Sequence, residues 1–462
     1  MSEMKKNYII LIFILSLAAF LRLYRLPEMA SFDFDQEYAA NFAYNVLRVY
    51  PIQLIGQGLS VEGLFMGPWY FYYLVPFFAV TNLHPLGGVI GSVILSLFII
   101  LTYFLVGKSL FGIKAGIIAA FIRSLLSTEM GNDLSMAPAY ASELIVLITW
   151  VLFYKYWQGQ TKYLLILGFV FGLYTSIHPI LFPFYFVFLT LLILKRKLPD
   201  IKYLFLSVFA FILPIVPLII FEYLHNFLEV KRLAELFSTS PAEGGRTYEI
   251  IKYLSLNAGE PQRILNLNFI PEQFFTILFL TIIIILAFKG VGFWKDKFHK
   301  YFLFIAYFVF LIYYTFFPTH VPEYYFQGLT TLAILYIPAN LALMVKHRLL
   351  RILLIIIIIN FTFVNIQSLI GKWNNPSLIT LYNKDVIVRE IIKRTSPNQE
   401  FYVSYIKEPG WNFGFDYLFK YYGRIPQTRE AKPPVYTIVI PKALSLDSLD
   451  LVYGNIGLIL PK

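Results

Sequence analysis

The chain of 462 residues contains no cysteine. Without a thiol it can form no disulfide bond, no zinc–thiolate site and no cysteine nucleophile. Charged residues are also scarce, at 14% of the chain, whereas soluble domains carry about 25%. Hydrophobic residues reach 58%, and so much apolar surface needs lipid to cover it. The composition therefore predicts a membrane protein.

The charge that is present is mostly positive, with a net value of +11. Many of the cations stand in short connections between apolar runs, where the positive-inside rule assigns them to the cytoplasm. This pattern explains the positive charge without a nucleic-acid partner. The connections are those with Lys5 and Lys6, Lys108 and Lys114, Lys155 and Lys162, and the stretches 195–202, 289–300 and 346–351.

Apolar runs approach the length of about 20 residues that a membrane-spanning helix needs. They predict an all-α polytopic membrane protein of about 11–13 spans. The run 67–81 is short and contains Pro76, and counting it as a span breaks the alternation of sides, so whether it crosses or re-enters stays open. The predicted spans are 7–23, 67–81, 86–106, 114–131, 137–154, 162–178, 180–194, 202–222, 274–288, 301–317, 324–344 and 350–367.

The chain changes character near its C-terminal end, which predicts a transmembrane part at 1–370 and a small α/β domain at 371–462. The apolar spacing predicts helices at 384–393 and 415–422 and strands at 401–406, 435–440 and 456–460. With the cations inside, this domain and the long connections 24–66 and 223–273 lie outside the cytoplasm, at the plasma membrane. Apolar residues at 250–256 predict a short amphipathic helix in the second connection.

The segment from Ser31 to Tyr38 holds Asp33, Asp35 and Glu37 within five residues, just beyond the first span. Three carboxylates so close repel one another, and their place at a membrane surface makes sense if a base or an anion is needed there. The alternative is a solvated loop that caps a helix at 39–49, with Asp35 as the N-cap. The residues alone do not decide between the two.

The acidic segment is followed by Gly67-Pro68-Trp69-Tyr70-Phe71-Tyr72-Tyr73, and other short motifs follow in a fixed order. Together they resemble membrane glycosyltransferases of the GT-C superfamily, in particular the glycosyltransferase 39, or dolichyl-phosphate-mannose protein mannosyltransferase-like, family. The resemblance implies transfer of a sugar, with inversion, from a polyprenyl-phosphate donor to a hydroxyl of a lipid, glycan or protein at the outer face. The further motifs are Leu110-Phe111-Gly112, Ala137-Pro138, Phe221-Glu222-Tyr223-Leu224-His225-Asn226-Phe227 and Asp416-Tyr417-Leu418-Phe419.

The resemblance also implies that one outer aspartate deprotonates the acceptor. By position this role falls to Asp35, with Asp33 as the rival and Glu37 as a further catalytic candidate. Gln36 separates Asp35 from Glu37, so the adjacent acidic pair of the family is broken here. The residue type suits the reaction, because a carboxylate within ~3 Å of an attacking hydroxyl can accept its proton.

The leaving group would be a lipid phosphate, whose developing charge needs cations. Arg246 and Arg263 are the candidates, because a guanidinium binds phosphate in a bidentate way; the alternative is that they are solvated charges paired with neighbouring glutamates. Arg123 lies inside a span, where a structural partner is expected. The remaining candidate substrate contacts, each with a structural alternative, are Asp133, His178, Glu222, His225, His320 and Glu323.

No cofactor is predicted, because no metal-ligand spacing, Walker loop, GxSxG or HExxH motif is present, although a divalent cation stays open. A second function is a transporter or flippase of polyprenyl-linked glycans. Such a protein should carry charged residues along a central path and show paired halves. Here the acids gather in the outer connections and no internal repeat is visible, which favours the enzyme.

Overall fold

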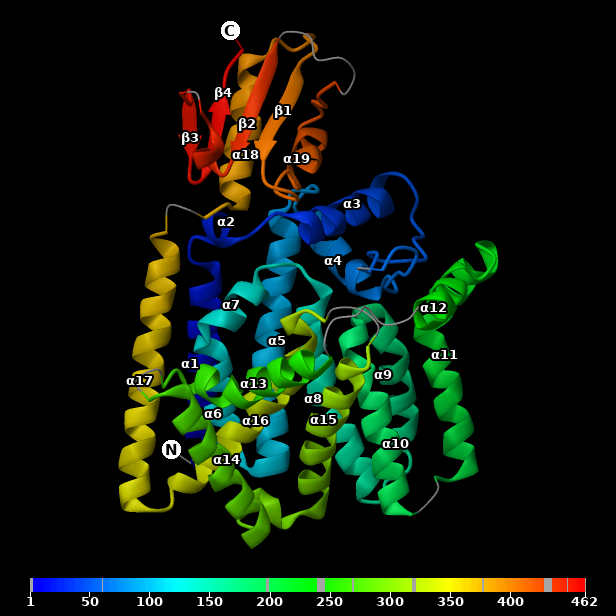
Figure 1. Ribbon diagram of the computed structural model, residues 1–462, viewed down its shortest axis with the longest axis vertical. Helices are drawn as coiled ribbons and strands as arrows, with labels where there is room; N and C mark the ends of the chain where they lie inside the picture. The colour runs from blue at the N-terminus through cyan, green and yellow to red at the C-terminus, as the bar shows by residue number, and fades with distance from the viewer. Residues whose placement is uncertain are drawn as a thin grey trace.

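The structure is a computed structural model that describes residues 3–59, 61–196, 199–238, 246–267, 270–317, 321–375, 378–427, 434–446 and 448–461. A long bundle of helices carries a small module of strands and helices at one end (Figure 1). The bundle helices are α1 (Glu3–Leu23), α2 (Leu26–Met29), α3 (Phe34–Arg48), α4 (Trp69–Val80), α5 (Leu86–Phe111), α6 (Ile113–Leu125), α7 (Ser127–Asp133), α8 (Pro138–Trp157), α9 (Tyr163–Ile177), η1 (Pro179–Leu181), α10 (Pro183–Lys195), α11 (Ile201–Leu224), α12 (Leu228–Ser238), α13 (Arg246–Leu265), α14 (Glu272–Lys289), η2 (Gly292–Lys295), α15 (Lys297–Thr315), η3 (Glu323–Phe326), α16 (Gln327–Met344) and α17 (Arg348–Trp373).

Within the described ranges, seven helices are long and apolar enough to cross a membrane, or eight if the bent pair α7 and α8 forms one span. Shorter apolar helices include α4 and α9. Lipid-facing helices such as α11, α14 and α17 expose many large apolar side chains, as expected where lipid replaces water. The chain is therefore an integral membrane protein with a mostly helical fold, as its composition predicts.

The predicted span 114–131 is the one that the structure breaks. Helix α6 ends at Leu125, Leu126 is extended, and α7 then runs to Asp133 before a bend of 113° into α8. The backbone N–H of Ser127 donates to the side chain of Asn365 on α17, at 2.8 Å. The side chain of Asn365 thus replaces the helical hydrogen bond that the N–H of Ser127 lacks after α6 ends. A hydropathy pattern cannot reveal such a break.

The contacts after helix α4 indicate that the stretch 67–81 does not cross the bundle, a point that the sequence leaves open. After α4, the carbonyl oxygen of Leu83 accepts a hydrogen bond from the hydroxyl of Tyr417 in the module, at 2.7 Å, and His84 packs against Tyr421. The turn before α5 therefore lies at the module end of the bundle, as α3 does. The cationic connections α10–α11, α14–α15 and α16–α17 lie at the opposite end (Figure 1).

The module at the C-terminal end contains a four-stranded sheet in the order β1–β2–β4–β3. Strand β1 pairs with β2 in parallel, and β4 pairs antiparallel with both β2 and β3. The predicted helices and strands are all present, and β3 is an additional strand too short to show in the sequence. The elements are α18 (Leu381–Arg394), β1 (Tyr402–Lys407), α19 (Phe415–Tyr421), β2 (Val435–Ile440), η4 (Lys442–Leu444), β3 (Leu451–Tyr453) and β4 (Ile456–Ile459).

The connection after α11 is also helical. The predicted amphipathic segment at 250–256 belongs to α13, a helix of 20 residues that packs against α14, α15 and α16. In Figure 1 it runs across the bundle rather than along it. Its buried residues, among them Tyr253 and Ile264, face these helices, so α13 brings polar side chains of the connection against α14, α15 and α16.

Candidate active site

The acidic segment forms the first turn of α3, and helix geometry separates its three carboxylates. The helix begins at Phe34, and Asp33 is its N-cap, with its N–H bound to Oε1 of Gln36 at 2.8 Å. The predicted helix start at 39 with Asp35 as the cap is therefore wrong, because the capping pair Asp33 and Gln36 starts the helix earlier. Residues four apart share a face, so Asp33 and Glu37 point one way and Asp35 another.

Asp33 and Glu37 bind the C-terminal module. The ammonium of Lys384, which is fully buried, lies 2.6 Å from Oδ1 of Asp33 and also donates to two backbone carbonyls. Burial lowers the pKa of Lys384, and the charge of Asp33 opposes this change. Oε1 of Glu37 accepts the N–H of Tyr417 in α19 at 2.9 Å, and burial raises the pKa of Glu37. These two acids thus anchor the module to α3.

Asp35 borders a cavity of about 700 Å³ between α3 and the rest of the bundle. Its Oδ1 accepts a hydrogen bond of 2.5 Å from Nε2 of Gln57, which fixes one edge of the carboxylate. The wall is mixed, with hydroxyl, amide and aromatic groups from segments far apart in the sequence. Besides Asp35, these include Asp33, Gln57, Ser135, Tyr140, His178, Tyr324 and Tyr325.

His178 lies in the wall of this cavity and is held in place by its neighbours. Its Nδ1 accepts the N–H of Ile180 at 3.3 Å, so the imidazole caps η1. The ring packs edge-on against Tyr324 and Tyr325, with centroids 5.8 and 5.5 Å away. His178 thus has the structural role that the sequence offers as the alternative. Because it also lies in the wall of the cavity, its ring can still contact a bound ligand.

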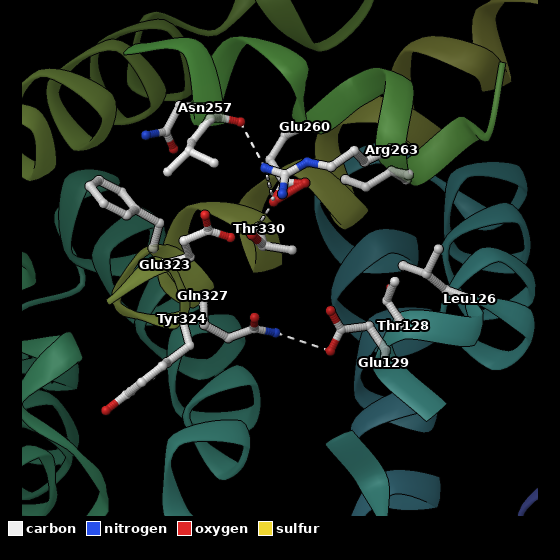
Figure 2. Close-up of a pocket in the computed structure, with 13 residues that line it drawn as sticks. Leu126, Thr128, Glu129, Asn257, Glu260, Arg263, Glu323, Tyr324, Gln327 and Thr330 are labelled. Carbon is white, nitrogen blue, oxygen red and sulfur yellow. Dashed lines mark hydrogen bonds and ion pairs between the residues drawn. The ribbon is translucent and has the colours of Figure 1, made fainter. Parts of the chain in front are cut away.

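A second cavity, of about 180 Å³, lies on the other side of Tyr324, which lines both. Figure 2 shows side chains converging from α7, α13, η3 and α16. The hydroxyl of Thr330 donates to Glu260 at 2.6 Å, and the amide of Gln327 donates to Glu129 at 3.1 Å. The polar residues around it are Thr128, Glu129, Asn257, Glu260, Arg263, Glu323, Gln327 and Thr330.

Among the described residues that line this second cavity, one is a cation, Arg263, and three are glutamates. The side chain of Arg263 is about half exposed, at 52%, and its guanidinium is held by the carbonyl of Leu256 at 2.8 Å and by Glu260 at 3.4 Å. Three carboxylates would repel a phosphate from the interior, whereas the exposed part of Arg263 offers positive charge at the rim. The cavity interior is instead suited to hydroxyl groups.

Two predicted donor contacts cannot be placed at this site. Arg246 starts α13, 17 positions before Arg263, so the two lie about 25 Å apart along a straight helix. The two arginines are therefore too far apart to hold the same phosphate together, although they stand in the same connection. The side chain of Arg246 and the whole of His320 lie outside the described residues.

Asp133 belongs to a buried ion cluster rather than to either cavity. Its carboxylate lies 2.7 Å from Arg22 and 2.6 Å from Arg123, and Arg123 also binds Glu143 at 2.8 Å. The prediction of a structural partner for Arg123 is thus confirmed. Because Asp133 is fully engaged, the alternative of a structural role describes its geometry better than a contact to substrate.

Glu222 and His225 lie at the end of α11, away from both cavities. Glu222 accepts the backbone N–H groups of Glu229 and Val230, at 3.0 and 3.2 Å, at the start of α12. His225 stacks on Phe221 with ring centroids 4.0 Å apart. Both side chains fix the turn between α11 and α12.

In the part of the chain that the structure describes, no group of three or more acids and histidines is arranged to hold a metal ion.

No protein-family profile and no curated protein matches the chain. Among solved structures, ArnT from Cupriavidus metallidurans bound to undecaprenyl phosphate matches over 97% of both chains, with a TM-score of 0.60 at 10% identity. Its apo form matches over 99% of this chain and 98% of that chain, with a TM-score of 0.61 at 10% identity. AglB from Archaeoglobus fulgidus, in complex with an inhibitory peptide and a dolichol-phosphate, matches over 94% of this chain and 65% of that chain, with a TM-score of 0.46 at 13% identity. The likeness to ArnT shows that this chain has the GT-C fold.

Proposed function

We propose that the protein is an inverting glycosyltransferase that moves a sugar from a polyprenyl-phosphate donor to an acceptor hydroxyl of a lipid, glycan or protein. The observation that carries the proposal is the carboxylate of Asp35 at a 700 Å³ cavity, next to a second, polar cavity. The GT-C fold supports it, and so does the undecaprenyl phosphate bound to ArnT. The order of motifs favours the glycosyltransferase 39-like family.

In the proposed reaction, Asp35 accepts the proton of the acceptor hydroxyl as its oxygen attacks the anomeric carbon. The bond from that carbon to the phosphate oxygen breaks on the opposite face, which inverts the configuration and releases the polyprenyl phosphate. Gln57 holds Oδ1 of Asp35, so the carboxylate keeps one orientation before the acceptor arrives. Such a general base contributes about 10²–10⁴ in rate.

The second cavity would hold the polar head of the donor. Its glutamates, amides and hydroxyls can exchange hydrogen bonds with sugar hydroxyls, and Arg263 at the rim can meet the phosphate. Tyr324 lines both the second cavity and the cavity of Asp35. A sugar bound in the second cavity would therefore turn its anomeric carbon past Tyr324 toward Asp35. The apolar chain of the donor would then extend into the lipid.

Replacing Arg263 with alanine should raise the apparent KM for the donor by about one to two orders of magnitude. Loss of one charge-assisted hydrogen bond costs about 1.5–3 kcal/mol, which sets this range. Arg232→Ala is the matched control, because its ion pair with Glu235 on α12 is exposed and Arg232 lines neither cavity. Steady-state kinetics over a donor titration measures the effect. Wild-type donor KM and turnover in Arg263→Ala would move the phosphate site elsewhere.

The proposal itself is tested with purified protein and a panel of radiolabelled polyprenyl-phosphate sugars. The expected result is release of the lipid phosphate with one of the sugars and appearance of the label in an acceptor fraction. A flippase would instead carry a lipid-linked glycan across a liposome membrane with the bond between sugar and phosphate intact. Transport without bond cleavage would therefore contradict the enzyme and support the transporter.

We also propose that the module and both cavities lie outside the cytoplasm, because the cationic connections gather at the opposite end of the bundle. The absence of cysteine allows a direct test. Ser396→Cys, at an exposed position after α18, should react with a membrane-impermeant maleimide on intact cells. Gln158→Cys, exposed in a cationic connection, should react only after lysis. The reverse pattern would invert the topology.

A further inference from the structure

A third cavity, of about 500 Å³, opens between α3 and residues 409–413 of the C-terminal module. Aromatic side chains form much of its wall. The rings of Phe34 and Phe413 meet edge to face with centroids 4.9 Å apart, and Trp411 adds a third ring. Phe34 is about half exposed, at 49%, although it stands beside a buried interface. An aromatic side chain left open in this way is available to a ligand.

This third cavity also contains one carboxylate, that of Asp33. Its side chain is 51% exposed, while Oδ1 is fixed by Lys384. Lys384 already donates to Asp33 and to the carbonyl oxygens of Phe32 and Phe413, so its positive charge is committed to the protein. The site therefore offers a rigidly held acceptor oxygen among aromatic rings, rather than a free cation.

The third cavity continues into the cavity of Asp35. Asp33 and Phe34 line both of them, and Asp35 follows directly in the sequence. A ligand in the third cavity would therefore border the cavity that the proposed base lines. Its volume falls within the range of about 300–1,000 Å³ that is typical of small-molecule sites.

We propose that this third cavity binds a sugar ring of the acceptor and presents one of its hydroxyls to Asp35, an inference that rests on the proposed transfer reaction. A pyranose ring has apolar C–H faces that pack on aromatic rings and hydroxyls at its edge that donate to a carboxylate. A hydrocarbon chain would leave the carboxylate unused, and an anion would be repelled by it. The acceptor is thus a glycan or a glycolipid head group, with Trp411 and Phe34 as binding residues.

The test measures direct binding to the full chain in lipid nanodiscs free of sugar-headed detergent. The probes are methyl glucoside, mannoside, galactoside and N-acetylglucosaminide, titrated by calorimetry without donor. At least one should bind saturably, and Trp411→Ala should weaken its affinity by about tenfold, the size expected for one aromatic contact. Tyr382→Ala, an exposed aromatic side chain on α18, is the matched control and should bind as the wild type does.

The two sources of the sugar are separated by repeating the titration with octyl glycosides. Tighter binding of the octyl form, with the same loss in Trp411→Ala, indicates a glycolipid; equal binding indicates a soluble glycan. Saturable binding of octanol in place of the methyl glycosides would overturn the assignment, and so would full affinity in Trp411→Ala. Donor turnover is measured separately, in the assay with radiolabelled polyprenyl-phosphate sugars. Glycoside binding without turnover in that assay would contradict the proposed transfer reaction, whereas turnover without glycoside binding would contradict only this inference.

Discussion

Replacing Asp35 with asparagine is expected to lower sugar transfer by about two to four orders of magnitude while donor binding and folding persist. Asparagine keeps the shape of the side chain, and its amide oxygen can still accept the hydrogen bond from Gln57, but it cannot accept a proton at neutral pH. The loss should therefore appear in kcat, with little change in the donor affinity. Single-turnover transfer and equilibrium donor binding measure the two quantities separately.

Asp33→Asn is the matched control for this experiment, because it makes the same chemical change two positions away. It removes the partner of the buried Lys384, so it should lower the melting temperature and loosen the module. The proton-accepting group at Asp35 remains, so the chemical step should survive in the folded fraction at saturating acceptor, while the acceptor KM rises because Asp33 lines the proposed acceptor cavity. Full turnover in Asp35→Asn together with loss of transfer in folded Asp33→Asn would assign the base to Asp33 instead.

Replacing Arg123 with methionine is expected to lower the free energy of unfolding by about 3–5 kcal/mol. Arg123 joins Asp133 to Glu143, and Arg22 completes a cluster of two positive and two negative groups that is almost wholly buried. Methionine has a similar length but leaves Glu143 without its cationic partner in the bundle. The loss of stability comes mainly from the buried carboxylate of Glu143, because its ion pair with Arg123 offsets the cost of removing that charge from water.

Arg232→Ala serves as the control for the buried cluster. Its ion pair with Glu235 is exposed on both sides, and such pairs contribute about 0–1 kcal/mol. Reversible unfolding in mixed micelles, or melting temperatures of the purified variants, can be compared directly. Equal destabilisation of the two variants would mean that the buried cluster does not hold α1, α6, α7 and α8 together.

The seven long spans among the described residues could be predicted because hydropathy is summed over about 20 residues and tolerates local errors. The same sum cannot distinguish a crossing from a re-entrant helix. For the apolar stretch of α4 it therefore left crossing and re-entry open, whereas contacts from Tyr417 and Tyr421 hold the turn after α4 at the module end, where α3 also lies. The break after Leu125 was hidden for a similar reason, since its partner Asn365 is 238 positions away from Ser127.

The acidic segment shows how much of the site was within reach of the sequence. Asp33 and Gln36 have the spacing of a capping box, which predicts a helix from Phe34 and places Asp33 and Glu37 on the opposite side from Asp35. The partners could not be predicted, because Lys384 is 351 positions from Asp33. The second cavity gave no local signal either, since its glutamates come from α7, α13 and η3, which only the packing of the bundle brings together.

The central claim is that the cavity at Asp35 is where donor and acceptor meet. Its most direct test is an electron cryo-microscopy structure of Asp35→Asn, trapped with the polyprenyl-phosphate sugar that the wild type turns over. The account predicts sugar density in the second cavity beside Tyr324, with the anomeric carbon toward the substituted position 35 and the phosphate near the rim at Arg263. Density for the sugar and phosphate at another place on the bundle, with both cavities empty, would contradict it.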